Sequence, residues 1–311
     1  MRLAAIYNTM PKKLNNSFKF VASDLNSKIR LDLLLANNFD KFSRSQWTDQ
    51  VTRGNVKLNN RIVKPSAKVS NQDTVSGYLP EIDSSNKLTS PDVMPKVLYK
   101  DDDVIVINKP AGLLSHALSN KSANSVAGAF SSEVKDKDPL RAGIVHRLDK
   151  QTSGVMILAR NIQAKKFLQD QFKSRKVKKV YTALVHGHLQ SNEARLELPI
   201  ARSNNNPQKM IISKQGKPAI SEYNIIKQYQ DYTLVSVKIM TGRTHQIRVQ
   251  MAYIGNPVAG DLLYGHNKYD PLIDRQFLHA SELTIELPSK HKKTFRAPLA
   301  DDLKAILKDL K

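Results

Sequence analysis

The sequence predicts an α+β protein with a mixed, mainly antiparallel central sheet and flanking helices, preceded by a small N-terminal α/β domain. Three observations predict the large sheet. Residues 104–107 and 154–159 are short apolar runs with the length of buried strands. Residues 179–186 alternate in the manner of a strand. Strand patterns outnumber helical ones without a regular βαβ order, which argues against a doubly wound parallel sheet.

Length and composition predict the domain organisation. A chain of 311 residues is long enough for two domains. We expect a basic tail over residues 1–17, a small domain over 18–80 and one large domain over 97–311. Residues 81–96 are rich in Ser and Pro and poor in bulky apolar side chains, which is typical of a linker.

The charge of the chain indicates an anionic partner. Lys and Arg number 49 against 28 Asp and Glu, which gives a net charge of +21. Such a charge can serve solubility alone, but it fits nucleic-acid binding better. No apolar run approaches the roughly 20 residues of a membrane helix, and no basic amphipathic segment indicates membrane binding. The absence of cysteine excludes disulfides, thiolate catalysis and Cys-ligated zinc.

The small domain begins with two predicted helices. Residues 27–36 carry a leucine face typical of a helix. Ser43 can cap a second helix, because its hydroxyl can accept a hydrogen bond from an unpaired backbone amide. Residues 54–63 then show strand alternation broken by Asn59 and Asn60, which predicts a hairpin.

This helix–helix–hairpin order resembles a small RNA-binding domain that occurs in a small-subunit ribosomal protein, in tyrosyl-tRNA synthetase and in several RNA-modifying enzymes. The resemblance implies that the second helix and the hairpin face RNA. The contacting cations would be Arg44, Lys57, Arg61 and Lys64. The alternative is that these are ordinary solvated surface cations.

The large domain contains further predictable elements. Apolar side chains at helical spacing predict a helix over residues 164–172. Residues 223–226 and 233–240 are expected strands, whereas 199–212 reads as an irregular basic stretch.

A dense polar cluster, His146-Arg147-Leu148-Asp149, lies between two apolar core segments. A loop between core strands is a rigid support, and functional groups often lie on such loops. Three polar or charged side chains within four residues must be paired if they are buried. The cluster is therefore a candidate catalytic site, and a structural ion-pair loop is the alternative.

A second cluster covers residues 241–248, Thr-Gly-Arg-Thr-His-Gln-Ile-Arg. Thr244 could cap a short helix over residues 245–254. Arg243 and Arg248 can then point to similar sides of the helix start and offer guanidinium groups to phosphates or a carboxylate. An ordinary basic helix is the alternative.

Taken in order, these motifs resemble the RluA type of RNA pseudouridine synthases, which act on ribosomal and transfer RNA. The shared segments are Asn108-Lys109-Pro110-Ala111-Gly112, His146-Arg147-Leu148-Asp149 with Thr152-Ser153-Gly154, Lys179-x-Tyr181 and Gly242 to Arg248. The resemblance runs from about residue 97 to 298 and includes the N-terminal domain. Two specific motifs in the same order, separated by most of a domain, argue against a chance match.

The resemblance implies three catalytic residues. Asp149 matches the catalytic aspartate, a nucleophile that would attack either the ribose or the base. Arg248 matches the arginine that pairs with this carboxylate and would keep it ionised and aimed. Tyr181 matches the tyrosine that packs on the uracil and is placed to take the proton from carbon 5. By itself, a tyrosine on a strand is more often part of the core.

Three further residues would support catalysis or contact RNA. Arg147 matches an arginine that fills the space left by the flipped base. His146 and Arg243 would be supporting or RNA-contacting groups. The reaction requires no redox cofactor, metal or ATP, and the sequence has no Gly-rich phosphate loop or metal-ligand spacing.

The expected partner is large-subunit ribosomal RNA. Residues 141–145 and the N-terminal domain are most similar to the D type of large-subunit enzyme, which modifies a ribosomal RNA stem-loop. The C type, acting at other large-subunit positions, is the second choice, and a transfer RNA target is the third. A non-catalytic ribosome-assembly factor is the alternative from another class. A metal-dependent nuclease fits poorly, because the run Asp101-Asp102-Asp103 is better explained as an acidic turn.

We expect a monomer in the bacterial cytoplasm. Residues 1–23 contain four Lys or Arg and no acid, so the mitochondrial matrix is the alternative location.

Overall fold

The computed structural model describes residues 16–39, 41–80, 93–117, 124–136, 138–265 and 273–310. The chain forms two compact units, residues 1–86 and 87–311. The predicted basic tail over residues 1–17 lies outside the described residues except for its last two, and β1 begins at Ser17. Residues 81–92, most of the predicted linker, also lie outside them.

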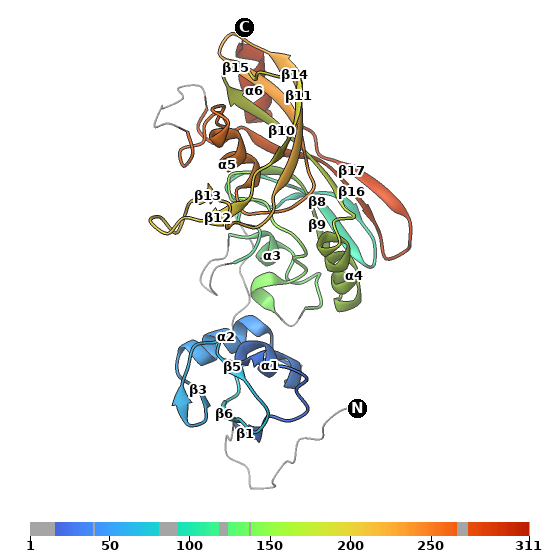
Figure 1. Cartoon of the computed structure of the whole chain (residues 1–311). Helices are drawn as coiled ribbons and strands as arrows, with labels where there is room; N and C mark the ends of the chain where they lie inside the picture. Colours follow the sequence, from blue (N-terminus) through green and yellow to red (C-terminus); the bar gives the residue numbers. More distant parts are fainter. Residues whose placement is uncertain are drawn as a thin grey trace. The chain divides into compact units, whose positions relative to one another are not determined.

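The N-terminal unit combines two helices with an antiparallel sheet in the order β1-β6-β3-β4 and a short β2-β5 pair (Figure 1). Its elements are β1 (Ser17–Val21), β2 (Ile29–Arg30), α1 (Leu31–Asn38), α2 (Arg44–Thr52), β3 (Val56–Leu58), β4 (Arg61–Ile62), β5 (Lys68–Val69) and β6 (Thr74–Tyr78). The helix predicted over residues 27–36 begins later, because Ile29 and Arg30 pair with β5. Trp47 fills the core and is ringed by Phe18, Phe39 and Phe42.

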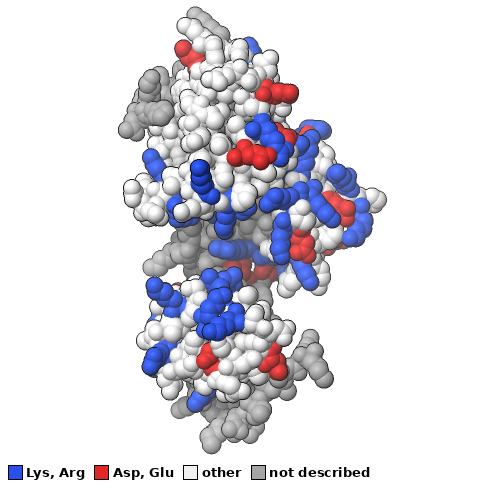
Figure 2. Space-filling view, viewed as in Figure 1, with Lys and Arg blue, Asp and Glu red and all other residues white. Residues whose placement is uncertain are grey.

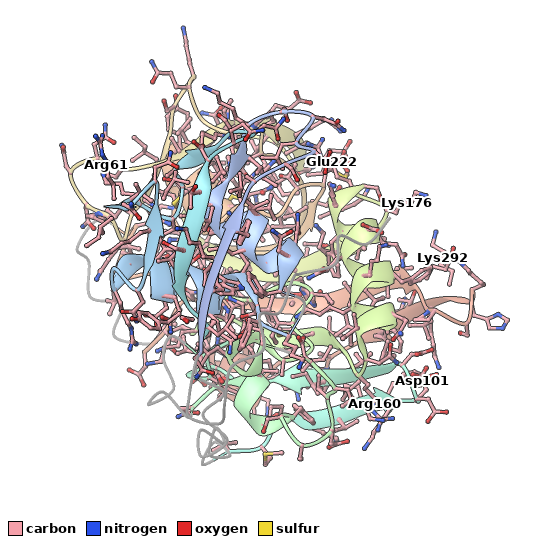
Figure 3. All side chains as sticks on the ribbon, turned by 90° about the horizontal axis from the view of Figure 1, so that it is seen from below. Arg61, Asp101, Arg160, Lys176, Glu222 and Lys292 are labelled. Carbon is pink, nitrogen blue, oxygen red and sulfur yellow. The ribbon has the colours of Figure 1, made fainter. Side chains whose placement is uncertain are left out.

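Local sequence signals account for two features of this unit. The Ser43 hydroxyl accepts a hydrogen bond from the Gln46 N–H, and the Gln46 side chain accepts one from the Ser43 N–H, so the predicted cap of α2 is confirmed. Asn59 and Asn60 have φ values of 50° and 62°, a left-handed pair that asparagine tolerates well. The predicted hairpin at these residues is also confirmed. Arg61 projects from this hairpin (Figure 3).

The C-terminal unit is built on a mixed sheet of nine strands among the described residues, in the order β11-β14-β15-β10-β16-β9-β8-β7, with β17 paired to β16 (Figure 1). In the described part of this sheet, only the β16–β9 pair is parallel. The strands are β7 (Lys96–Lys100), β8 (Val104–Lys109), β9 (Ser153–Ala159), β10 (Lys178–His186), β11 (Glu193–Glu197), β14 (Ile220–Gln228), β15 (Tyr232–Ile239), β16 (Leu278–Glu286) and β17 (Lys292–Arg296). The predicted fold class, a mainly antiparallel mixed sheet with flanking helices, is confirmed.

Short helices surround this sheet. They are α3 (Val126–Ala129), a 3-10 turn η1 (Pro139–Arg141), α4 (Ile162–Lys173), α5 (Gln246–Tyr253) and α6 (Asp301–Asp309). The helix predicted over residues 164–172 is thus present as α4, and Asn161 caps it by accepting from the Ala164 N–H. Within the described residues, no helix has the length and apolar character needed to cross a membrane.

One predicted segment is wrong in part, because residues 203–209 are irregular as expected but the residues on either side form strands. The stretch 199–212, expected to be irregular, contains a small hairpin of β12 (Ile200–Arg202) and β13 (Met210–Ile212). Strands of three residues are too short to show an alternating pattern.

The buried centre of the large sheet positions the candidate motifs. All seven residues of β9 are buried, and the cluster of residues 146–149 lies in the loop that leads into this strand. β10, which is separated from β9 by β16, carries Tyr181. The segment that follows β15 leads into α5 and Arg248. Rigid strands therefore hold both sides of one site.

Candidate active site

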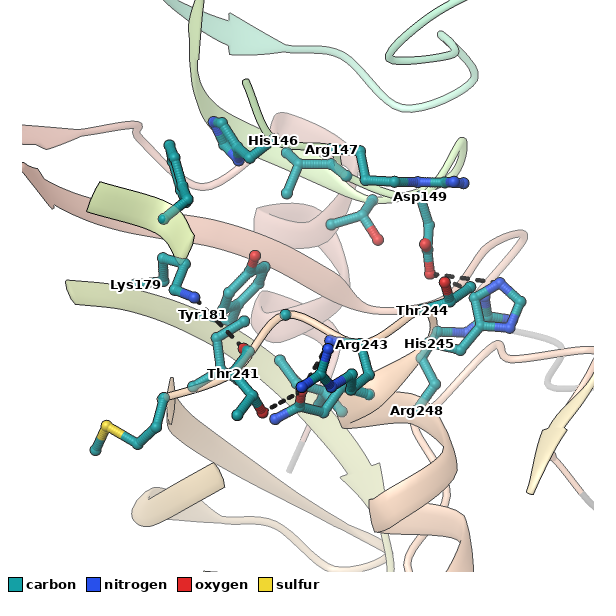
Figure 4. Close-up of a pocket in the computed structure, with 18 of the residues that line it drawn as sticks. His146, Arg147, Asp149, Lys179, Tyr181, Thr241, Arg243, Thr244, His245 and Arg248 are labelled. Atoms are coloured by element: carbon teal, nitrogen blue, oxygen red, sulfur yellow. Dashed lines mark hydrogen bonds and ion pairs between the residues drawn. The ribbon is translucent and has the colours of Figure 1, made fainter. Parts of the chain in front are cut away.

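A pocket of about 430 Å³ in the C-terminal unit brings the three sequence motifs together (Figure 4). Lys179 and Tyr181 lie side by side on one wall, and Asp149, His245 and Arg248 lie on another (Figure 4). The ionised side chains among its lining residues are Arg147, Asp149, Lys173, Arg175, Lys179, Arg243 and Arg248. The candidate catalytic residues, far apart in the sequence, thus face one space.

Arg248 is buried between two carboxylates. Its Nη1 donates to Asp149 Oδ2 at 3.1 Å. Its Nε and Nη2 donate to the two oxygens of Asp261 at 2.6 and 2.8 Å. The paired hydrogen bonds to Asp261 fix the plane of the guanidinium group, which leaves Nη1 aimed at Asp149.

Asp261 is the main site residue that the sequence did not reveal. Its side chain is fully buried, and its Oδ1 also accepts from the N–H groups of Leu263 and Tyr264. The preceding Gly260 has φ +71°, and a Cβ there would lie 2.2 Å from the Arg275 carbonyl oxygen, so glycine is required. A Gly-Asp pair in a turn was the available signal, but such pairs are common in ordinary turns.

The turn into α5 differs from the prediction. Thr244 does not cap the helix: His245 is the N-cap residue, in a left-handed conformation with φ 56° and no capping side-chain bond. The turn is held by the buried Gln246 amide, whose oxygen accepts from the Thr241 hydroxyl and the Arg243 N–H.

Arg243 and Arg248 both line the pocket, but they contact different groups. Arg243 precedes the helix and donates from Nε to the Pro218 carbonyl, whereas Arg248 turns inward to Asp149 and Asp261.

His245 links Asp149 to a second aromatic residue. Its Nε2 lies 3.9 Å from Asp149 Oδ2, and its Nδ1 lies 2.8 Å from the Tyr264 hydroxyl. Burial lowers the pKa of His245, which favours the neutral ring. The Tyr264 hydroxyl accepts from the Met210 N–H at 2.8 Å, and its ring lies against the Arg248 guanidinium. Tyr264 therefore braces two groups that contact or face Asp149.

Tyr181 contributes a buried aromatic wall. Its side chain is nearly covered, and burial together with the nearby charge of Asp149 raises the pKa of the phenol far above its ordinary value. At neutral pH Tyr181 is therefore a protonated phenol. On the same strand, Lys179 donates to the Thr241 carbonyl at 3.4 Å, and burial lowers its pKa to about 8.

Buried polar groups support the loop that carries Asp149. The Ser115 hydroxyl donates to the Leu148 carbonyl at 2.7 Å and accepts from the Leu148 N–H at 3.0 Å. The fully buried Lys109 ammonium donates to the carbonyls of Pro110, Leu113 and Lys150. These contacts tie the loop to the end of β8 and restrict the position of Asp149.

His146 occupies a supporting position beside this loop. Its Nε2 accepts from the Ile157 N–H at 3.1 Å, and its ring stacks on Phe172 with centroids 4.7 Å apart. Because Nε2 accepts a hydrogen bond, it carries no proton. Burial and the charge of Lys179 lower the pKa of His146 to about 3. A direct contact of His146 with RNA stays a prediction.

The pKa of His146 predicts acid sensitivity. In the unfolded chain a histidine titrates near pH 6.5, whereas in the folded chain its pKa is about 3. The neutral His146 ring therefore contributes fully to the unfolding free energy above pH ~6.5, and this contribution is lost as the pH falls toward 3. The variant His146→Gln keeps a hydrogen-bond acceptor but cannot titrate. When the pH falls from 7 to 5, we expect the unfolding free energy of the wild type to fall by up to about 2 kcal/mol more than that of this variant. Urea denaturation at both pH values measures this difference, and equal losses in the two proteins would contradict it.

In this pocket a buried arginine, Arg248, orients the carboxylate of Asp149, and Tyr181 lies on the opposite wall. A pocket of this kind, lined by cations, suits an enzyme that acts on a base taken out of an RNA strand. Comparison with known proteins agrees with this class. Residues 103–253 match the family model described as RNA pseudouridylate synthase. The chain belongs to this family and is an RNA pseudouridine synthase.

Individual relatives cover most of the chain. An uncharacterized RNA pseudouridine synthase of Bacillus subtilis, YlyB, is 34% identical over 95% of this chain and 99% of its own length. Ribosomal large subunit pseudouridine synthase D of Borreliella burgdorferi is 36% identical over 86% of this chain and 85% of its own. The solved structure of human RNA pseudouridylate synthase domain containing 1 superimposes with a TM-score of 0.56 and 26% identity, covering 68% of this chain and 87% of its own.

Proposed function

We propose that this synthase isomerises uridines in large-subunit ribosomal RNA, with Asp149 as the nucleophile. The observation that carries the proposal is the Asp149 carboxylate, which lines the pocket 3.1 Å from a buried guanidinium. The target rests on relatives of 32 to 36% identity that are named ribosomal large subunit pseudouridine synthase D. A monomer in the bacterial cytoplasm is the corresponding proposal for assembly and location.

The reaction breaks the bond between ribose C1′ and uracil N1 and forms a bond between C1′ and C5. The proton lost from C5 balances the proton gained at N1. A carboxylate oxygen of Asp149 would bond transiently to the ribose or to the base and would leave again when C1′ joins C5. Because the Tyr181 phenol is protonated, its first role is to pack on the uracil, and it could accept the C5 proton only by passing its own proton on.

The remaining predicted site residues are proposed RNA contacts. Arg147 is exposed and lines the pocket, so its planar guanidinium can stack where the flipped base was. Arg243 lines the same pocket.

In the N-terminal unit, four exposed cations are proposed to bind RNA. They are Arg44, Lys57, Arg61 and Lys64. Arg44 also pairs with the buried carboxylate of Asp32 at 3.0 Å, which fixes its position at the start of α2. The guanidinium of Arg44 stays about half exposed and can still reach a phosphate.

Removing residues 1–86 tests the role of this unit. The two units are separately compact, so we expect residues 87–311 to fold and to keep catalysis on saturating RNA. Affinity should fall, and the slope of log Kd against log salt should flatten by about 0.7 to 0.9 for each lost phosphate contact. Filter binding over a salt series measures both quantities. Unchanged affinity, slope and site choice would remove the proposed role.

Mapping pseudouridines tests the target. Ribosomal RNA from cells with and without this gene should differ at one or more large-subunit positions. A difference confined to transfer RNA would exclude the ribosomal target while leaving the chemistry of the site intact.

A further inference from the structure

The pocket carries more positive charge than its chemistry uses. Among the described residues, six Lys or Arg side chains line it, and Asp149 is the one carboxylate that does so. Arg248 is offset by Asp149 and Asp261. Within the described part of the chain, the other five form no ion pair; these are Arg147, Lys173, Arg175, Lys179 and Arg243. Cations gathered without countercharges create a strong positive potential that attracts an anion.

Arg175 stands out among these five by its backbone. It follows the end of α4 with φ 60°, a left-handed conformation that is uncommon for residues with a Cβ and usually taken by glycine at a helix end. Its N–H donates to the Phe172 carbonyl, and its side chain is exposed at the pocket. An arginine thus occupies a position where the backbone itself favours glycine.

The surface around Arg175 extends the positive charge away from the pocket. Figure 2 shows Lys and Arg side chains gathered over α4 and the β16–β17 hairpin. Lys176 follows the end of α4 and points outward (Figure 3). Lys292 is exposed on β17, and Lys178 is exposed on β10, where it pairs with Glu282 at 2.9 Å. A cation after the last turn of a helix can also serve the helix dipole alone. That role would not require its side chain to line the pocket.

We propose that Arg175, together with Lys173, binds a phosphate of the RNA strand next to the uridine in the pocket. A uridine that enters the pocket remains joined to its neighbours, so its flanking phosphates must lie at the pocket rim. The planar guanidinium suits two oxygens of one phosphate, and Lys173 adds a second charge. This proposal rests on the proposed function, because it takes the reacting nucleotide to be the one held by Asp149.

The left-handed backbone allows an informative variant. Arg175→Gly removes the side chain and suits φ 60°, so its melting temperature should not fall. Lys290 offers a matched control, because it is an exposed cation with φ 65° in the turn between β16 and β17 and does not line the pocket. Lys290→Gly removes the same charge and the same backbone constraint elsewhere, together with the contact of the ammonium with the Phe167 ring at 4.4 Å and its 3.9 Å pair with Glu286. Arg175→Lys restores the charge without the planar guanidinium.

The experiment uses the full chain and two unmodified transcripts, large-subunit ribosomal RNA and transfer RNA, labelled with tritium at uridine C5. Release of tritium reports pseudouridine formation, because C5 loses its hydrogen, and filter binding gives Kd over a salt series. With the transcript that the wild type modifies, Arg175→Gly should raise KM and Kd roughly tenfold. Its kcat should change little, and its salt slope should flatten by about 0.7. Arg175→Lys should recover the slope and part of the affinity, and Lys290→Gly should match the wild type.

Three results would overturn the phosphate contact. They are an unchanged KM and salt slope in Arg175→Gly, an equal loss in Lys290→Gly, or a loss that follows a fall in melting temperature. Failure of the proposed function has a different signature, in which the wild type releases no tritium from ribosomal RNA. The Arg175 comparison is then decided on transfer RNA, or on the salt slope of binding if neither transcript reacts.

Discussion

Asp149→Asn is expected to lower pseudouridine formation by roughly four orders of magnitude or more, while RNA binding persists. Asparagine has the same shape as aspartate. Its Oδ1 can still accept a hydrogen bond from Arg248 Nη1, which lies 3.1 Å from the carboxylate in the wild type. The pocket should therefore keep its geometry. An amide, however, is not a usable nucleophile, so no bond to the ribose or base can form. Binding should be equal or tighter, since a negative charge that faces RNA is removed.

Tritium release from uridine C5 and filter binding measure the two expected effects of Asp149→Asn separately. Asp102→Asn is the matched control, because this carboxylate is fully exposed and its only ion-pair contact within the described residues, with Arg160, is 3.9 Å long. The control should behave as the wild type in both assays. Substantial turnover by Asp149→Asn would exclude Asp149 as the nucleophile. Loss of binding together with activity would instead assign it a structural role.

Much of the fold could be predicted because its signals are local or repeated. The buried strands β8 and β9 are continuous apolar runs, and the hairpin at Asn59 and Asn60 has residues that tolerate its backbone. β12 and β13 were missed because three residues cannot establish a period. The helix start at α5 was predicted wrongly, since nothing in a single sequence reveals that His245 adopts a left-handed conformation and that Gln246 holds the turn.

Residues of the candidate site could be predicted only where they belong to a motif that resembles the family. Asp149 and Arg248 are 99 residues apart, and their hydrogen bond became expected only through the family resemblance. No motif marks Asp261, because its role depends on Arg248, which the fold places beside it. Tyr181 lines the pocket, and its catalytic role stays a prediction. Its high pKa depends on burial and on the charge of Asp149, which the sequence does not show.

The buried pair of Arg248 and Asp261 leads to the largest expected effect on stability. In Asp261→Asn, one oxygen can still accept from the N–H groups of Leu263 and Tyr264, but the new amide N–H group must face a guanidinium donor. Arg248 then keeps only Asp149 as a countercharge. Breaking one partner of a buried ion pair costs about 3 to 5 kcal/mol, and we expect a loss of this size in the unfolding free energy of the C-terminal unit.

Catalysis by Asp261→Asn should fall by about a hundredfold even at temperatures where the variant is folded, because a displacement of Arg248 by about 1 Å misaims Asp149.

Asp302→Asn is the matched comparison. Asp302 makes the same two-bonded contact with Arg275, but its side chain is half exposed, so water can replace the lost contact. We expect this variant to lose less than about 1 kcal/mol. Urea denaturation and tritium release measure the two variants side by side. If Asp302→Asn lowered the unfolding free energy and the tritium release as much as Asp261→Asn, the pair of Arg248 and Asp261 would not be what positions Asp149.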